Sequence, residues 1–192
     1  MNETEIIEVL ESRGAVLRGH FRLSSGRHSD VFVQKFRVFE DPRLTQRFGE
    51  SIAELFPNGF DLVASPAIGA ITLGFAVALA AEVKMIFAER HEGFLTFRRG
   101  FTIEPHALAL VVEDVITTGG SAREVVSLVK DSGAEVVGVG ALLDRADPAS
   151  SHDLGAPLRA LVKLETASWD PADCPLCARA EPITDPGSRR LT

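Results

Sequence analysis

The stretch LVVEDVITTGGS, from Leu110 to Ser121, decides the fold of this 192-residue chain. It begins with an apolar run, continues with two adjacent acids, Glu113 and Asp114, and ends in Thr, Gly and Ser residues that open another helical pattern. An uninterrupted apolar run is typical of a strand buried on both faces of a parallel sheet. Ligands of such sheets bind at the carboxyl ends of the strands. The stretch therefore predicts a strand, a binding loop and a helix in succession.

The predicted loop has the chemistry of a phosphate site. Gly119 and Gly120 allow a tight turn and a close approach of the backbone to an anion. The N–H groups and the dipole at the start of a helix favour negative charge, and Thr117, Thr118 and Ser121 add hydroxyl donors. The two acids repel phosphate, so they suit the two hydroxyls of a ribose ring or a magnesium ion. The alternative is an ordinary capped helix beside two solvated acids. Capping explains Ser121 or Thr118, but it does not explain two acids followed by a loop of Thr, Gly and Ser residues. The spacing of the loop matches neither the dinucleotide-binding fingerprint nor the P-loop.

Strand-like and helix-like patterns alternate on both sides of this stretch. We expect strands at 61–64, 84–88, 107–112, 135–143 and 158–164, and helices at 3–13, 42–56, 69–82 and 119–132. Two shorter strand-like runs lie at 20–23 and 31–33, 93–97 is either a strand or a mobile loop, and the tail from Trp169 looks irregular. Such alternation predicts an α/β fold with a doubly wound parallel sheet and helices on both faces.

Composition excludes several classes of protein. The 20 Lys and Arg residues against 27 Asp and Glu residues give a net charge of −7, which disfavours binding to nucleic acid. The stretch from Leu62 to Ala81 carries no charge and is long enough to span a membrane, but Pro66, Gly69 and Gly74 favour a strand, a turn and a buried helix. Two cysteines make no disulfide scaffold, and the acidic N-terminus has no signal layout, so we expect a cytoplasmic protein with no membrane partner.

VVEDVITTGGS resembles the 5-phosphoribosyl 1-diphosphate (PRPP) motif of the type I phosphoribosyltransferases, in the form found in the orotate phosphoribosyltransferases. Three further segments resemble parts of that family in the same order: Gly19–Gln34 its N-terminal hood, Ser65–Ala70 its pyrophosphate loop, and Leu142–Asp147 its Asp-Arg pair. The resemblance implies the type I phosphoribosyltransferase fold. It also implies a single domain over 1–192, with a small hood at about 1–40 and an irregular C-terminal tail at 168–192.

The resemblance implies a role for each matching residue. Glu113 and Asp114 match the acids that bind the ribose hydroxyls, and we also expect Asp114 to be a catalytic residue. Arg145 matches the arginine that pairs with the orotate carboxylate, which a planar guanidinium can hold with two parallel hydrogen bonds. The alternative role of Arg145 is a surface ion pair with Asp144 or Asp147. The other PRPP-binding positions are Val115, Ile116, Thr117, Thr118, Gly119, Gly120, Ser121, Ala67, Ile68 and Gly69, and the other orotate-binding positions are Thr117, Phe32 and Val33.

Three segments depart from the family pattern by losing cations. Ser24 stands where many members have a lysine, and Ile68-Gly69 stands where they have Tyr-Lys. The mobile catalytic loop keeps Arg90 and loses two lysines. Arg98 and Arg99 are candidates to replace them, since arginine can clamp a leaving pyrophosphate. The alternative is an exposed hairpin whose arginines touch only water.

The implied reaction transfers the phosphoribosyl group from PRPP to orotate and yields orotidine 5′-phosphate and pyrophosphate, a step of pyrimidine biosynthesis. The resemblance also implies a magnesium ion held mainly by PRPP, and a homodimer in which the loop at 90–99 reaches the partner's site. Two alternatives remain. One is a purine phosphoribosyltransferase, whose neutral base gives Arg145 no carboxylate. The other is a PRPP-sensing regulator without catalysis, against which the net charge speaks.

Cys174 and Cys177 form a C-x-x-C pair in the proline-rich tail. A tetrahedral zinc site needs four ligands, and no other cysteine exists, so His152, Asp173 or a second subunit would have to complete it. We favour free structural thiols, then a metal site, then a redox pair, and we assign no metal to protein ligands. No metal-ligand spacing is evident among the histidines, which are His20, His28, His91, His106 and His152.

Overall fold

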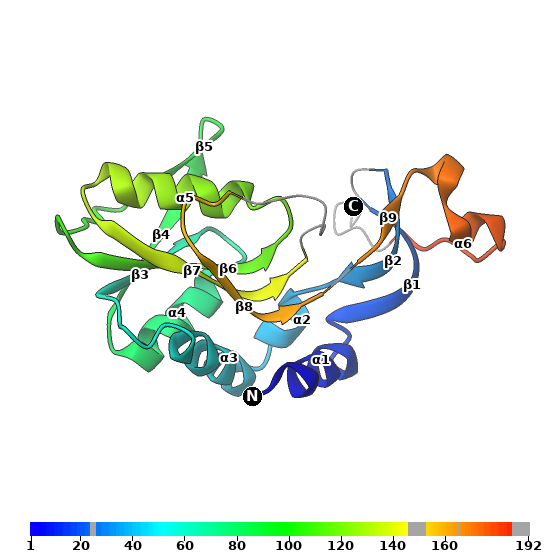
Figure 1. Ribbon diagram of the computed structural model, residues 1–192, viewed down its shortest axis with the longest axis horizontal. Coiled ribbons are helices and arrows are strands. Elements are labelled where there is room, and N and C mark those ends of the chain that lie inside the picture. Colours follow the sequence, from blue (N-terminus) through cyan, green and yellow to red (C-terminus); the bar gives the residue numbers. More distant parts are fainter. Residues whose placement is uncertain (24–25, 146–152, 165, 186–192) are drawn as a thin grey trace.

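The computed structural model describes residues 1–23, 26–145, 153–164 and 166–185. Two sheets lie side by side along the longest axis (Figure 1). The larger sheet is made of β3 (Leu62–Pro66), β4 (Lys84–His91), β5 (Phe94–Phe97), β6 (Leu108–Ile116), β7 (Glu135–Asp144) and β8 (Leu158–Lys163). The smaller sheet is made of β1 (Val16–Arg22), β2 (His28–Val33) and β9 (Ser168–Trp169). The helices are α1 (Glu3–Ser12), α2 (Phe36–Phe39), α3 (Pro42–Glu54), α4 (Ile71–Ala81), α5 (Gly120–Asp131) and α6 (Pro175–Ala178), with a 3-10 turn at Pro171–Asp173.

The larger sheet, called the main sheet below, has the strand order β5-β4-β3-β6-β7-β8. All neighbouring strands are parallel except β5, which forms an antiparallel hairpin with β4. The reversal of order beside β3 and β6 is the topological switch point at which doubly wound sheets bind ligands. The predicted α/β fold class is confirmed, and 93–97 is a strand rather than an irregular loop.

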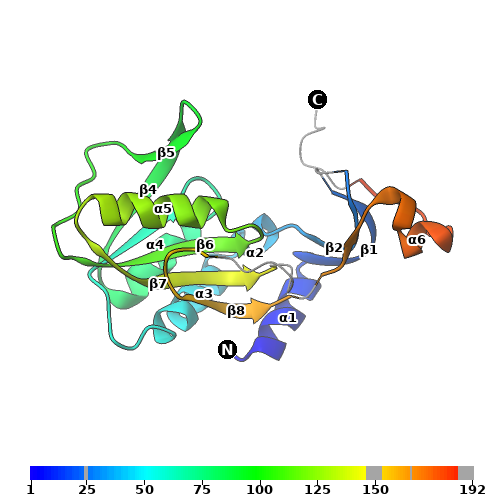
Figure 2. The same cartoon turned by 45° about the horizontal axis from the view of Figure 1, so that its top comes forward.

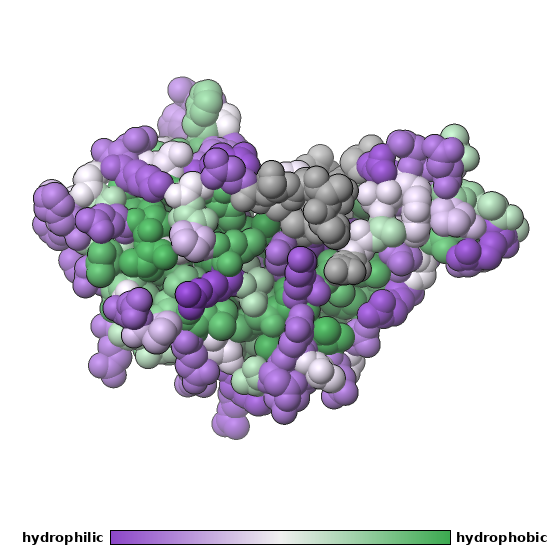
Figure 3. All heavy atoms as spheres, viewed as in Figure 1, coloured by the Kyte–Doolittle hydropathy of each residue, from purple (hydrophilic) through white to green (hydrophobic). Residues whose placement is uncertain are grey.

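Helices lie on both faces of the main sheet (Figure 2), and apolar side chains pack between the helices and the strands. On one face Phe48 and Ile52 of α3 pack with Leu73 of α4. On the other face Val125 and Val129 of α5 pack against the strands. Figure 3 shows hydrophobic residues gathered between α3 and α5, with hydrophilic residues around the periphery. This two-sided burial explains why the central strands read as continuous apolar runs in the sequence.

The uncharged stretch from Leu62 to Ala81 folds as β3, a turn and α4. All of β3 is buried in the sheet, and α4 is shorter than a bilayer-spanning helix. Over the residues described, no helix combines the length and the apolar character needed to cross a membrane.

The smaller sheet, called the hood below, is assembled from both ends of the chain. β2 pairs with β1 on one side and with β9 on the other, and Phe21 bridges to Thr184. The expectation of an irregular tail is therefore wrong in part, because backbone pairing with the hood orders it as β9 and α6. His20 and His28, on adjacent strands, face Cys174 and Cys177 of the tail, although the histidines show no metal-ligand spacing in the sequence. Of the two residues suggested to complete a site with the cysteines, Asp173 is not part of this cluster and His152 lies outside the described residues.

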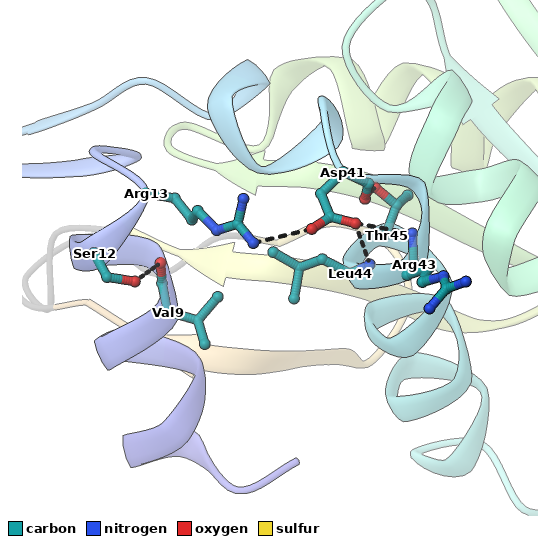
Figure 4. A network of polar contacts seen from close by, with 7 residues as sticks. All are labelled: Val9, Ser12, Arg13, Asp41, Arg43, Leu44 and Thr45. Carbon is teal, nitrogen blue, oxygen red and sulfur yellow. Dashed lines mark hydrogen bonds and ion pairs between the residues drawn. The ribbon is translucent and has the colours of Figure 1, made fainter.

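Polar contacts join α1 to the main body (Figure 4). Asp41 caps α3 by accepting from the backbone N–H groups of Arg43 and Leu44, and it accepts a further hydrogen bond from Arg13 at 3.0 Å. The Leu44 N–H, above all, lowers the pKa of Asp41, and the charge of Arg13 adds to the effect. One carboxylate thus both starts α3 and anchors the end of α1.

Candidate functional site

The two acids lie inside β6 rather than beyond its end. β6 runs on to Ile116 because β7 pairs with it as far as Asp144. Asp114 is only 1% exposed and Glu113 is 8% exposed. The expectation of a strand that ends at residue 112, before the two acids, is therefore wrong, since the sheet extends past the apolar run and encloses them.

Lys35, which the sequence analysis did not single out, is the cation of this site. Its Nζ lies 2.9 Å from Oδ1 and 2.7 Å from Oδ2 of Asp114. Asp114 Oδ1 also accepts from the N–H of Val115, while Oδ2 accepts no well-directed hydrogen bond from the described residues. A buried carboxylate oxygen with spare acceptor capacity is suited to a ligand hydroxyl.

Burial raises the pKa of Glu113 to about 8, and the neighbouring charge of Asp114 adds to the rise. Glu113 Oε1 accepts a hydrogen bond from the N–H of Asp114. Two adjacent acids in a poorly hydrated strand do not both ionise readily, so near neutral pH they hold one negative charge more easily than two. The pair can thus offer both a donor and acceptors to the hydroxyls of a sugar.

The predicted phosphate loop follows β6 directly. Gly119 has a φ of +72°, a conformation that favours glycine, and α5 begins at the next residue. Among the described residues no side chain caps this end of α5, so the N–H groups of its first turn remain available. Thr117 and Thr118 are exposed and Ser121 is half-buried. Backbone and hydroxyl donors thus surround an open helix start, as an anion site requires.

The segment from Ala67 to Gly69 lies against the acids, between β3 and α4. A Cβ atom on Gly69 would lie 2.2 Å from Asp114 Oδ2 and 2.8 Å from Lys35 Nζ. Only glycine therefore allows this loop to approach the ion pair so closely. The Ala67–Ile68 peptide bond is cis, and the Ile68 side chain is 78% exposed.

Arg145 connects the main sheet to the hood. Its backbone N–H donates to the Ile116 carbonyl at 2.8 Å, which places it beside the start of the phosphate loop. Its guanidinium donates to Thr166 Oγ1 at 3.1 Å and to the Val31 carbonyl of β2 at 3.3 Å. Burial lowers the pKa of Arg145, and the charge of Asp30 opposes that effect. The predicted positions Phe32 and Val33 follow Val31 directly, so the structure brings Arg145 and this strand together.

The β4–β5 hairpin carries the three arginines of the predicted catalytic loop. Arg90 donates to the Gly93 carbonyl and to Glu124 of α5, and Arg99 makes two hydrogen bonds of 2.8 Å to Glu89. Arg98 is exposed and forms no ion pair with the residues described. None of the three contacts Asp114 or the phosphate loop of the same chain. The structure thus gathers the PRPP and orotate positions and leaves the hairpin arginines apart.

Several known proteins resemble the chain over its full length. No protein-family model matches the chain. It is 44% identical over 193 residues to the orotate phosphoribosyltransferase of Desulforamulus reducens, and 45% identical over 192 residues to that of Pelotomaculum thermopropionicum, with 100% of both chains covered in each case. Its fold matches the crystal structure of Mycobacterium tuberculosis orotate phosphoribosyltransferase with a TM-score of 0.68 and 27% identity, over 84% of this chain and 96% of that one.

Proposed function

Because the chain belongs to the orotate phosphoribosyltransferase family, we propose a role for each part of the site in the reaction of that family. The enzyme transfers the phosphoribosyl group from PRPP to orotate and produces orotidine 5′-phosphate and pyrophosphate. Neither a purine phosphoribosyltransferase nor a regulator without catalysis is the better description, because the full-length relatives are orotate enzymes. The observation that carries the assignment is an ion-paired, buried acid pair followed directly by an uncapped helix start.

The phosphate loop binds the 5′-phosphate of PRPP. Residues 115–121 connect the acids to α5, and the free N–H groups of the first turn of that helix donate to the phosphate oxygens. Thr117, Thr118 and Ser121 add hydroxyl donors. The same loop keeps the ribose next to the acids. The 5′-phosphate and the ring hydroxyls belong to one small sugar, so neighbouring residues of the chain must bind them.

Glu113 and Asp114 bind the two ring hydroxyls. The spare acceptor Oδ2 of Asp114 accepts a hydrogen bond from a ring hydroxyl, and the Glu113 carboxyl donates when it is protonated and accepts when it is ionised. As the bond to the leaving pyrophosphate lengthens, the ribose gains oxocarbenium character. The negative charge of Asp114 then stabilises the sugar more in the transition state than in the ground state.

The Ala67–Gly69 loop and Lys35 bind the pyrophosphate side of PRPP. Lys35 already lies within reach of both Gly69 and Asp114, so its ammonium group can bridge the sugar site and the departing charge. Lys35 thereby supplies a positive charge beside Ile68-Gly69, the segment in which the lysine of the family pattern is missing. We expect Lys35 to serve as a binding cation in the ground state and to stabilise the leaving group as the bond breaks.

A magnesium ion fits this site only as part of the substrate. Asp114 is already ion-paired with Lys35, which leaves it a poor ligand for a divalent cation. Among the described residues, no carboxylate cluster with the makings of a metal site lies here. The pyrophosphate and the ribose hydroxyls would hold the ion, and its charge would offset that of the leaving group when it is bound.

Orotate binds between the hood and the end of β7. The half-buried Arg145 guanidinium pairs with the carboxylate of the base in a bidentate manner. The backbone of Phe32 and Val33 lies along the pyrimidine ring, and Thr117 contacts it from the phosphate loop. The Val31 carbonyl already accepts a hydrogen bond from Arg145. β2 and the Arg145 guanidinium are therefore positioned relative to each other before orotate binds.

We propose a homodimer in which the β4–β5 hairpin serves the partner's site. Phe75 and Leu79, one turn apart on α4, are 60% and 57% exposed, and a second copy of the chain would cover this apolar face. The hairpin projects from the main body (Figure 1), so its arginines can reach beyond their own chain. Arg98, which has no ion pair with the residues described, is the cation best placed to meet a partner's pyrophosphate.

Mixed dimers test the shared site. Arg98→Ala and Asp114→Asn chains are each weakly active alone. If the hairpin crosses the dimer, each mixed dimer regains one intact site, and an equimolar mixture recovers about a quarter of wild-type turnover. If the hairpin serves its own chain, the mixture recovers nothing. Unchanged turnover in Arg98→Ala, Arg99→Ala and Arg90→Ala would remove the hairpin from the reaction altogether.

Turnover of PRPP with a panel of bases tests the function itself. We expect pyrophosphate release with orotate, and little or none with uracil, adenine or hypoxanthine, which lack a carboxylate for Arg145. Efficient use of a purine would contradict the orotate assignment. We also place the enzyme in the cytoplasm, where free thiols such as those of Cys174 and Cys177 persist.

A further inference from the structure

Four side chains at the junction of the hood and the tail converge on one point outside the proposed active site. His20 lies on β1, His28 on β2, and Cys174 and Cys177 flank the start of α6. One nitrogen or sulfur atom of each lies within 4.8 Å of the other three. His20 Nε2 lies 3.0 Å from His28 Nδ1, and Cys177 Sγ lies 3.3 Å from that Nδ1. No step of the proposed reaction uses these residues.

The spacing of the four atoms matches a tetrahedral zinc site. Zinc–nitrogen and zinc–sulfur bonds of ordinary length imply ligand separations of about 3.3 Å between two nitrogens and about 3.5–3.6 Å between a nitrogen and a sulfur. The structure has 3.0 Å between the nitrogens of His20 and His28. It has 3.6 Å and 3.7 Å from His20 Nε2 to the sulfurs of Cys174 and Cys177. Four of the six ligand separations thus lie within about 0.3 Å of the tetrahedral values, and the other two are no longer than 4.8 Å.

Neighbouring groups prepare these ligands for a metal. His20 Nδ1 lies 2.8 Å from the carbonyl oxygen of Glu181, which can only accept, so Nδ1 carries the proton and Nε2 presents its lone pair to the cluster. His20, His28 and Cys174 are buried, and Cys177 is exposed. Both cysteines are free thiols rather than a disulfide.

We propose that His20, His28, Cys174 and Cys177 bind one Zn²⁺ ion as a structural site that fastens the tail to the hood. Two thiolates and two imidazoles form a donor set typical of zinc. Four protein ligands leave no open position for a substrate, so the ion is structural. It joins His20 to Cys174, which are 154 positions apart in the chain. β9 and Thr184, on either side of the cysteine pair, pair with the hood strands and reinforce the same junction.

Metal analysis of the unmodified chain tests the proposal directly. The full chain, expressed with zinc in the medium and dialysed against metal-free buffer, should retain about one zinc per chain. Removal of zinc with a chelator and addition of Co²⁺ should produce the intense visible bands of tetrahedral cobalt with thiolate charge transfer. A chain without zinc and without a cobalt spectrum, or one whose cysteines form a disulfide, would overturn the proposal.

Substitutions at the ligands separate the metal site from other roles of the histidines. Cys174→Ser and His20→Asn should reduce bound zinc at least tenfold and lower the Tm. His106→Asn is the matched control: His106 has a φ of 64°, which asparagine tolerates, and should keep its zinc. Full zinc content in both ligand variants would refute the assignment. If the variants do not fold, thiol reactivity of the unmodified chain decides, because zinc should slow the reaction of both cysteines and the chelator should restore it.

Discussion

The main sheet and the hood are stabilised in different ways. Helices cover the main sheet on both faces, and all of its strands lie between Leu62 and Lys163. The hood has three strands drawn from opposite ends of the chain. Its junction with the tail consists of polar contacts, among them Arg22 with Asp185 and Arg27 with Asp170.

In the proposed function, the two regions also divide the substrates between them. The main sheet supplies the acids and the phosphate loop, so PRPP binding depends on a site built into the most buried strands. The hood supplies Phe32 and Val33, and it meets the main sheet at Arg145. In that proposal a sheet covered on both faces by apolar side chains holds the charged sugar phosphate, while the smaller hood encloses the base.

The largest expected effect comes from breaking the main-sheet site. Asp114→Asn should lower kcat by about 100- to 1000-fold, because it removes a charge that acts on the developing oxocarbenium, and it should raise the KM for PRPP. Steady-state kinetics with both substrates measures this. Asp131→Asn, at the exposed end of α5, is the matched control and should be neutral. An unchanged KM for PRPP in Asp114→Asn would remove this residue from the ribose site.

Cutting the link between the two regions should affect orotate alone. Arg145→Ala removes a charge-assisted pair, which costs roughly 1.5–3 kcal/mol, so the KM for orotate should rise about 10- to 100-fold. The KM for PRPP should change much less. Arg145→Lys should restore part of the affinity, since it keeps the charge without the planar fork. Equal effects on both substrates would contradict the carboxylate assignment.

A smaller effect concerns the proton on Glu113. Its pKa is raised to about 8 from 4.5, so the folded state binds a proton more tightly than the unfolded state. Stability from this group is fully present below pH 4.5 and is lost as the pH rises through about 8. Within that window the free energy of unfolding should fall by up to about 1.4 kcal/mol per pH unit.

Glu113→Gln should flatten that pH dependence, because glutamine cannot titrate. Denaturant unfolding between pH 5 and pH 8 measures the slope in each variant. Glu135→Gln, at the exposed start of β7, should behave like the wild type. A wild-type slope no steeper than that of Glu113→Gln would show that Glu113 does not hold its proton in the folded state.

The smallest effect tests the anchor between α1 and α3. Asp41→Ala loses both the cap of α3 and the contact with Arg13, and should lower the Tm by a few degrees, while Asp41→Asn should lose only the charge and cost less. The pKa of Asp41 is lowered, so its contribution is present above pH 3.8 and is lost as the pH falls below it. Thermal scans at neutral and acidic pH compare the two variants. An equal loss in both would indicate that the ion pair, not the cap, matters.

The main sheet and the position of the candidate phosphate loop were predictable from the sequence because they depend on local patterns. Apolar runs, helix periodicity and the loop at 117–121 all lie within short segments. The burial of Glu113 and Asp114 was not predictable, because it depends on how far β7 pairs beyond the apolar run. Lys35 was missed because a single lysine after a strand looks like a surface residue, and only the approach of the Gly69 loop shows where its ammonium group lies.

The hood was harder to predict because its contacts join distant parts of the chain. β9 has two residues and little pattern of its own, and it forms a strand because β2 offers an open edge. The histidines and cysteines show no metal-ligand spacing along the sequence, since β1 and β2 supply the two histidines and the tail supplies the two cysteines. One signal was available in the sequence. A C-x-x-C pair supplies only two of the four ligands of a tetrahedral zinc site, so such a site would need two further ligands from elsewhere.

The pairing of β2 with β9 sets an order of events during synthesis. Every strand of the main sheet has been translated by Lys163, whereas the last strand of the hood and both cysteines follow it. A nascent chain can therefore build its sugar-phosphate site while β2 still lacks its second neighbour, since folding proceeds as the chain emerges. Translation that stops between Lys163 and Ser168 would leave a chain with the PRPP site but an unfinished cover for the base. β9 and the cysteine pair thus complete the hood only after every strand of the main sheet has been made.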